Sequence, residues 1–178
     1  MNLRFSFKPT TLSAVLLLLS IPTGPLHLAH AQDDMDSLDC VFSVDRMIRF
    51  AERFQGVPYV WAANGPNSFD CSGFVHYVYS HAGYKVKRNS KQLSMEGREI
   101  AIVEVRKGDL IFFASGEPPE RDITHVGIAI SDYDPATRNF LFIHANKRDD
   151  CVAISNYNEQ RFRNSFGGAR RIIPCLDY

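Results

Sequence analysis

FDCSGFVHYVYSHAG, residues 69–83, is the stretch that decides how this chain folds. Asp70 favours the N-cap position of a helix, so Cys71 is expected in the first helical turn. Apolar residues then return every three or four positions up to Gly83, which predicts one amphipathic helix: Phe74, Val75, Val78, Tyr79 and Ala82. A cysteine at a helix start has three interpretations, namely a small buried side chain, half of a disulfide, or a nucleophile.

The segments on either side of this helix differ in the pattern of their apolar residues. Upstream, five apolar residues at helical spacing predict a first helix of about three turns, after Ser43 and before Gly56: Val44, Met47, Ile48, Ala51 and Phe54. Downstream, runs rich in β-branched and aromatic residues predict six short strands, at 99–105, 109–113, 125–131, 140–145, 152–155 and 169–173. Helices followed by strands indicate an α+β fold with an antiparallel sheet.

Two histidines are expected on one face of that sheet. The link 132–139 contains Asp134-Pro135 and is typical of a hairpin loop, which places the strand of His125 beside the strand of His144. Strand residues two apart share a face, so Val126 and Ile128 form the predicted core face and His125 points the other way. The alternation of the next strand allows His144 to emerge on the same side as His125.

These residues together predict a thiol active site. The start of a helix favours an anion, so we expect the pKa of Cys71 to lie below its reference of about 8.5. His125 begins the strand HVGIAI among small residues and is the predicted base, with His144 as its orienting group. The backbone N–H of Cys71, helped by the Tyr59 hydroxyl, is expected to stabilise an oxyanion. Ser72 and Gly73 are small and are expected to let a substrate backbone approach.

Structural interpretations of the same residues stay open. A cysteine at a helix start is commonly a buried packing residue, and a histidine beside a strand is commonly a satisfied structural one. His76 and His81 lie far around the helix from Cys71 and are expected at the surface or as capping groups. A zinc site made of Cys71, His125 and His144 matches no compact ligand spacing, so no metal is expected.

The N-terminus predicts a secretory leader. Arg4 and Lys8 precede an apolar run at 12–21, which is too short to span a bilayer core of about 30 Å. Ala29-His30-Ala31 then resembles a signal-peptidase site. We expect residues 1–31 to be removed and residues 32–178 to form one domain; a retained anchor is the alternative. The 20 basic and 20 acidic side chains balance, which gives no reason to expect nucleic acid as a partner.

Export would carry four cysteines, at positions 40, 71, 151 and 175, into an oxidising compartment. If Cys71 works as a free thiol, at most one intramolecular bridge forms among the other three. Cys40 and Cys175 lie near the two ends of the predicted mature chain, and chain ends often lie close together. That pair is the first expectation, while pairings that involve Cys151 stay open.

Five runs in this order resemble the NlpC/p60 family of cell-wall cysteine peptidases: YVWAANGPNSFDCSGFVHYVYSHAG, RNSKQ, RKGDLIFF, ITHVGIAI and FIHA. The resemblance covers roughly residues 50–173 and implies a papain-like α+β fold, with N-terminal helices packed on a small antiparallel sheet. It carries the nucleophile onto Cys71, the general base onto His125 and the orienting residue onto His144. It also matches three positions that line the substrate groove, which are Tyr59, Asp70 and Ser72.

The resemblance implies a periplasmic or secreted thiol hydrolase that cleaves amide bonds in peptidoglycan stem peptides or crosslinks. A monomer without cofactor, and without a membrane span once the leader is removed, is expected. The sequence departs from the family where Ala62-Ala63 replace two glycines after Trp61, and where Lys87 rather than proline precedes Arg88. The alternatives are a non-enzymatic cell-wall binding relative and a transferase or lipid-acting relative on the same fold. Which peptidoglycan bond is cut stays open.

Overall fold

The computed structural model describes residues 25–116 and 121–177, with the side chains of the first helix described from residue 38 onward. The helices are α1 (Pro25–Glu52), α2 (Cys71–His81), α3 (Ser90–Leu93) and α4 (Gln160–Ser165), and the 3-10 helices are η1 (Ile102–Glu104) and η2 (Pro174–Asp177). The strands are β1 (Arg98–Ile100), β2 (Leu110–Ser115), β3 (Asp122–Ala129), β4 (Leu141–Asn146), β5 (Cys151–Asn156) and β6 (Phe166–Arg171). Residues 1–24 of the predicted leader lie outside the described residues, and residues 25–31 begin α1.

The strands form one antiparallel sheet in the order β1-β6-β2-β3-β4-β5. β3 and β4 pair through the predicted hairpin, with Ile128 opposite Ile143. Strand β2 pairs with β3 on one side and with β6 on the other, and its register shifts next to Phe113 on both sides. The predicted class, N-terminal helices packed on a small antiparallel sheet, is confirmed.

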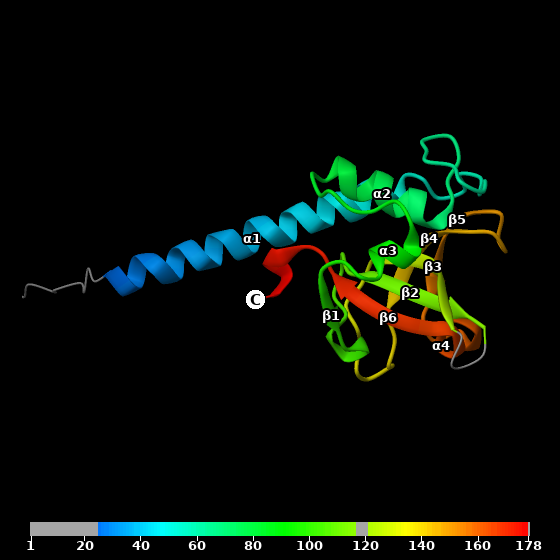
Figure 1. Ribbon diagram of the computed structural model, residues 1–178. Helices are drawn as coiled ribbons and strands as arrows, with labels where there is room; N and C mark the ends of the chain where they lie inside the picture. Colours follow the sequence, from blue (N-terminus) through cyan, green and yellow to red (C-terminus); the bar gives the residue numbers. More distant parts are fainter. Residues whose placement is uncertain (1–24, 117–120, 178) are drawn as a thin grey trace, which may run out of the picture.

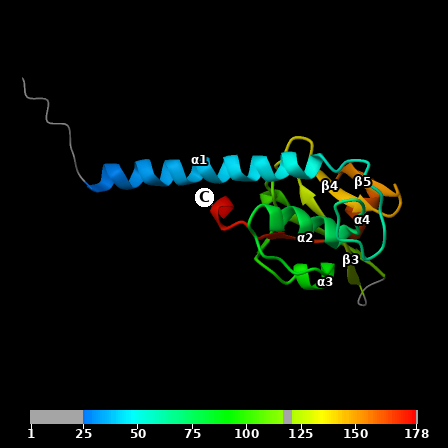
Figure 2. The same ribbon diagram turned by 90° about the horizontal axis from the view of Figure 1, so that it is seen from above.

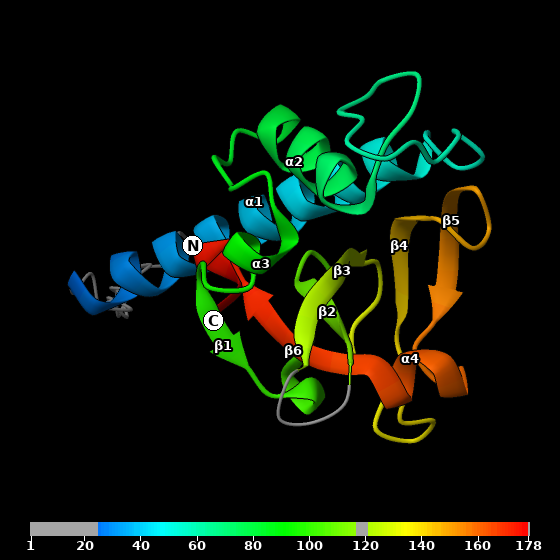
Figure 3. The same ribbon diagram turned by 45° about the vertical axis from the view of Figure 1, so that its right-hand side comes forward.

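Each face of the sheet carries a buried core. Figures 1 and 3 show α1 and α2 together on one side of the sheet, and Val126 and Ile128 belong to the core beneath them, which confirms the predicted core face. On the other face Phe113 and Phe142 pack against Phe162 of α4, with ring centroids 5.1 and 4.8 Å from it. The strand alternation therefore predicted which face receives the long helices, but not the second core.

Other differences concern short or irregular segments. The run 99–105 is not one strand, because β1 stops at Ile100 and the chain turns into η1, where the Glu104 carboxylate accepts the Ala101 N–H at 2.9 Å. Helix α1 starts well before the predicted helix, at Pro25, and its first turns extend beyond the rest of the fold (Figure 2). Helices of four and six residues, α3 and α4, carry too little periodicity to be predicted.

A buried ion pair joins the turn before β2 to the end of β6. Arg171 donates through Nε and Nη2 to the two carboxylate oxygens of Asp109, at 2.9 and 2.8 Å, and both side chains are buried. Arg171 also donates to the Glu104 carbonyl at 2.8 Å and to the Leu176 carbonyl at 3.1 Å. Burial raises the pKa of Asp109, while the bonds from Arg171 act in the opposite direction. One guanidinium thus fastens η1, β2 and η2 to β6.

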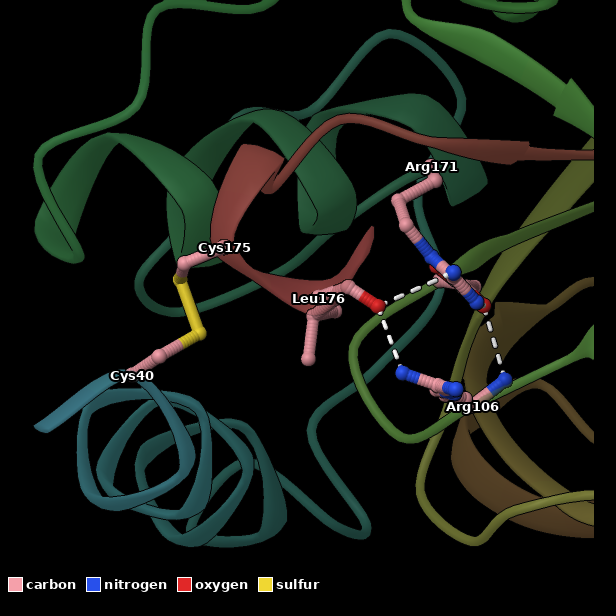
Figure 4. The surroundings of a disulfide bond; sticks show 6 residues. Cys40, Arg106, Arg171, Cys175 and Leu176 are labelled. Carbon is pink, nitrogen blue, oxygen red and sulfur yellow. Dashed lines mark hydrogen bonds and ion pairs between the residues drawn. A yellow bond between two sulfur atoms is a disulfide. The ribbon is translucent and has the colours of Figure 1, made fainter. Parts of the chain in front are cut away.

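A disulfide between Cys40 of α1 and Cys175 of η2 confirms the expected first pair (Figure 4). The Cα atoms are 5.9 Å apart and the bond closes a sequence separation of 135 residues. Next to it, the Leu176 carbonyl accepts bonds from Arg106 and Arg171 (Figure 4). The bridge therefore ties α1 to a segment that is itself bonded to the sheet. Cys71 and Cys151 are free thiols.

Loss of the bridge is expected to destabilise the oxidised protein. Cys175→Ser should lower the free energy of unfolding by about 2–5 kcal/mol, because the unfolded chain is no longer held in a large loop. Urea denaturation followed by circular dichroism measures the difference. Cys151→Ser is the matched control, since it removes a free thiol, and it should change stability far less. Equal stability of the oxidised wild type and Cys175→Ser would contradict a structural role for the bridge.

Candidate active site

Cys71 is the first residue of α2 and lies against strand β3. Asp70 caps the helix from an extended conformation, and its carboxylate accepts the Gly73 N–H at 2.6 Å and the Ser72 hydroxyl at 3.3 Å. The Cys71 sulfur lies 4.0 Å from the carbonyl oxygen of Thr124, the residue before His125, and the cysteine is 8% exposed. The predicted cap and the predicted first-turn position are confirmed.

Burial raises the pKa of Cys71, and the negative charge of Asp70 raises it further. The backbone N–H groups of Val126, Ser72 and Cys71 itself act in the opposite direction, as expected at a helix start, but they do not outweigh the burial. The prediction of a lowered thiol pKa is therefore wrong. Burial, together with the charges of Cys71 and Asp70, also raises the pKa of Tyr59, which lies half-buried close to both.

His125 and His144 are in direct contact, as predicted. The Nε2 atom of His125 lies 2.6 Å from Nδ1 of His144, and Nε2 of His144 lies 3.0 Å from the Ser155 hydroxyl on β5. His144 and Ser155 are buried. Ser155 was not singled out from the sequence, because its partnership with His144 depends on the pairing of β4 with β5.

Both imidazoles are neutral at neutral pH. Burial lowers the pKa of His125 to about 4, and the Arg161 cation contributes in the same direction. Burial, followed by His125 and Arg161, lowers the pKa of His144 well below its ordinary value. Within the described part of the chain, Cys71 and His125 are not hydrogen-bonded to each other, and hydrogen bonds of a catalytic pair are often long before substrate binds. The structure thus joins the two histidines to each other and places Cys71 against β3, the strand of His125.

Two pockets meet at Thr124. The first has a volume of about 370 Å³ and is lined by Cys71, Asp70, Ser72 and the loop residues Trp61 and Ala62. The second has a volume of about 260 Å³ and is lined by His125 and residues of β2, β4 and α4. Thr124 lines both, so the pocket of the thiol and the pocket of the imidazole adjoin at this residue.

Arg88 holds the wall of the first pocket. Its guanidinium donates to the Asp70 carboxylate at 2.7 Å, to the Ser72 hydroxyl at 2.8 Å and to the Ala63 carbonyl at 3.0 Å, and it also bonds the Asn64 side chain. These contacts fasten the loop before α2 to the helix. The sequence predicted Asp70 and Ser72 as groove residues, but it did not predict Arg88 as their shared partner, although Arg88 stands in the RNSKQ run.

Gly73 lets the loop that contains Ala63 lie directly against helix α2. A Cβ atom at Gly73 would lie 2.1 Å from the Ala63 carbonyl and 2.8 Å from the Arg88 guanidinium. The small residue is therefore needed for the loop to reach α2, whereas the sequence suggested room for a substrate. Ala62, in the same loop, has a φ of 64°, a region that favours glycine, and Trp61 at the pocket is 82% exposed.

The other two histidines whose side chains the structure describes, His76 and His81, lie on α2 away from its first turn. His81 ends α2, is exposed, and bonds the Tyr77 carbonyl through Nδ1 at 2.8 Å, as expected for a capping residue. His76 is half-buried on the same helix. Within residues 25–116 and 121–177, no group of three or more histidine, cysteine or acidic side chains is arranged to hold a metal ion. In the same part of the chain no helix has the length and apolar character needed to cross a bilayer.

Comparison with known proteins agrees with this architecture. The sequence profile of the NlpC/P60 family matches residues 56–171. The γ-D-glutamyl-L-lysine dipeptidyl-peptidase of Bacillus cereus is 33% identical over 132 residues, which cover 74% of this chain and 37% of that protein. The γ-DL-glutamyl hydrolase of Bacillus subtilis is 34% identical over 127 residues, which cover 70% and 28% of the respective chains. The chain thus spans roughly a third of these relatives.

Solved structures give the same result. An NlpC/P60 family protein from Bacillus cereus superposes with a TM-score of 0.66 at 33% identity, covering 74% of this chain and 40% of that one. The NlpC/p60 domain of the peptidoglycan hydrolase SagA superposes with a TM-score of 0.56 at 27% identity, covering 70% of this chain and 95% of that domain.

Asp70→Asn should lower the pKa of Cys71, because it removes the nearby negative charge while asparagine keeps an oxygen that can cap the helix. The thiolate fraction at pH 7 then rises, and alkylation of Cys71 by iodoacetamide becomes faster. The rate is measured against pH by mass spectrometry in a Cys151→Ser background. Glu99→Gln, at the exposed edge strand β1, is the control. An unchanged or upward-shifted profile for Asp70→Asn would contradict the assigned role of the carboxylate.

Ser155→Ala should destabilise the fold by about 1–3 kcal/mol, because it leaves the buried Nε2 of His144 without its hydrogen-bond partner. Urea denaturation measures the change. Ser115→Ala, at the exposed end of β2, is the control and should have little effect. If both variants lose the same small amount of stability, the bond from Ser155 to His144 does not contribute as the geometry indicates.

Proposed function

The chain belongs to the NlpC/P60 family, and we propose that it is a thiol hydrolase that cleaves amide bonds in the stem peptides or crosslinks of peptidoglycan. Cys71 is the nucleophile, His125 the general base and His144 the residue that orients it. One observation carries the proposal. The Cys71 sulfur contacts Thr124, the residue before His125, and His125 is hydrogen-bonded to His144. Tyr59, Asp70 and Ser72 belong to the acyl side of the groove.

The histidine contacts support one tautomer for His125. To accept a proton at Nδ1, His125 must carry its own proton on Nε2, which then donates to Nδ1 of His144. His144 in turn carries its proton on Nε2 and donates it to the Ser155 hydroxyl. Ser155 is therefore the end of a chain of bonds that keeps the lone pair of His125 Nδ1 free for the thiol.

The reaction proceeds from a neutral pair, because the pKa of Cys71 is raised and the pKa of His125 is lowered to about 4. The Cys71 sulfur attacks the carbonyl carbon while its proton passes to His125 Nδ1. The backbone N–H of Cys71 and the Tyr59 hydroxyl stabilise the oxyanion. His125 then gives its proton to the departing amine as the C–N bond breaks, and a water activated by His125 hydrolyses the thioester.

The names of two similar proteins support a γ-glutamyl bond as the one cleaved. Both the dipeptidyl-peptidase and the hydrolase from Bacillus are named for glutamyl substrates. The bond between the D-glutamyl residue and the diamino acid of a stem peptide has this chemistry. We place it before the crosslink bond as the candidate substrate.

We propose a periplasmic or secreted location. The disulfide between Cys40 and Cys175 supports folding in an oxidising compartment. Residues 1–31 have the features of a secretory leader, which leaves residues 32–178 as the catalytic domain.

The test is digestion of defined crosslinked and uncrosslinked muropeptides, with the products identified by mass. Wild-type protein should release peptide, and Cys71→Ser should be slower by about a thousandfold or more while its circular dichroism is unchanged. Cys151→Ser, which changes the other free thiol, is the matched control and should retain activity. Full activity of Cys71→Ser would refute the assigned nucleophile. Wild-type protein that binds murein but releases no peptide would support the non-enzymatic alternative.

A further inference from the structure

The pocket on the His125 side is built from four elements. It lies between the end of β2, the start of β3, the turn after β4 and helix α4, and its lining includes Phe113, Thr124, His125, Asn146, Arg148 and Arg161. Cys71 does not line it, and His125 does not line the Cys71 pocket. Among the described residues, the linings of the two pockets have only Thr124 in common.

This pocket carries positive charge. Arg148 is exposed, and its guanidinium makes no ion pair within the described part of the chain. Arg161 lies 2.8 Å from a carboxylate oxygen of Glu159 and 3.9 Å from one of Asp149, so its charge is partly compensated. The positive charge of Arg161 nevertheless acts on His125, because it contributes to the lowered pKa of this histidine. None of the described lining residues is acidic.

The Cys71 pocket differs in its electrostatics. Its acidic residue, Asp70, is paired with Arg88 at 2.7 Å, so the two charges compensate each other. Arg88 is further held by Ser72 and the Ala63 carbonyl, which leaves its guanidinium committed to the protein. A free anionic group on a substrate would thus meet unpaired positive charge only on the His125 side of these two pockets.

The chemistry assigns the two sides. The acyl part of a cleaved amide stays on the Cys71 sulfur, whereas the amine receives its proton from His125. The fragment that leaves as an amine therefore lies on the His125 side. Guanidinium groups bind carboxylates in a planar, charge-assisted geometry, which suits Arg148 at this position.

We propose that the pocket on the His125 side, which Arg148 lines, is a carboxylate-binding subsite for the residue that leaves as an amine. Arg148 makes the contact, and Arg161, held by Glu159, adds positive charge behind it. The ligand class is an amino acid whose α-amine is in the scissile bond and whose carboxylate is free. This inference rests on the proposed function and adds to it a preference for free acids over amides.

The test compares two peptides, L-Ala-γ-D-Glu-L-Lys with a free C-terminal carboxylate and the same peptide with a C-terminal carboxamide. Wild-type kcat/KM should favour the free acid by about tenfold, as expected for one charge-assisted hydrogen bond. In Arg148→Gln this ratio should fall to about one, and Arg148→Lys should retain part of it. Arg163→Gln, an exposed change in the same helix α4 as Arg161 and outside the pocket lining, should keep the wild-type ratio.

The outcomes separate the two proposals. A wild-type ratio of one, or a ratio that Arg148→Gln leaves at its wild-type value, would overturn the subsite while the hydrolase proposal stands. Cleavage of neither peptide by wild-type protein, combined with no release from muropeptides, would overturn both. Thermal unfolding of each variant shows whether it is folded, and Arg148→Lys provides a second folded variant if the glutamine variant is not.

Discussion

The candidate site depends on the capping of helix α2 by the Asp70 carboxylate. One of its oxygens accepts the Gly73 N–H at 2.6 Å and so fixes where α2 begins, and the other accepts Arg88 at 2.7 Å. Because Cys71 is the next residue, its sulfur is placed over β3 by this cap. Through Arg88 the same carboxylate also positions the preceding loop, which the small size of Gly73 allows to come within contact of the helix.

This placement has an electrostatic cost. The charge that caps the helix also raises the pKa of Cys71, adding to the effect of burial. On the opposite side, burial and Arg161 lower the pKa of His125. The thiol and the imidazole are therefore both neutral at rest, and in the proposed reaction proton transfer accompanies attack. A preformed pair of thiolate and imidazolium would need the opposite shifts, a lowered thiol pKa and a raised imidazole pKa. The two observed directions therefore distinguish this centre from one with a preformed thiolate.

The disulfide lies outside the segment that defines the family. The family match covers residues 56–171, whereas Cys40 and Cys175 stand on either side of it. The bridge joins α1 to η2, and the Leu176 carbonyl next to it accepts bonds from Arg171, the last matched residue. The flanking segments are thus connected to each other covalently, and to the buried ion pair of Arg171 with Asp109 by hydrogen bonds.

The sequence by itself determined the capped helix that begins at Cys71, the strands apart from the run 99–105, and the contact between His125 and His144. Caps, periodicity and hairpin pairing are local, and each is encoded within a few residues. Only the tertiary structure decided the direction of the Cys71 pKa shift, since desolvation depends on every element packed around the sulfur. The bond from Ser155 and the positive pocket at Arg148 likewise arise from strands and loops that meet only in the folded chain. Contacts between segments far apart in the sequence leave no periodic pattern from which they could be predicted.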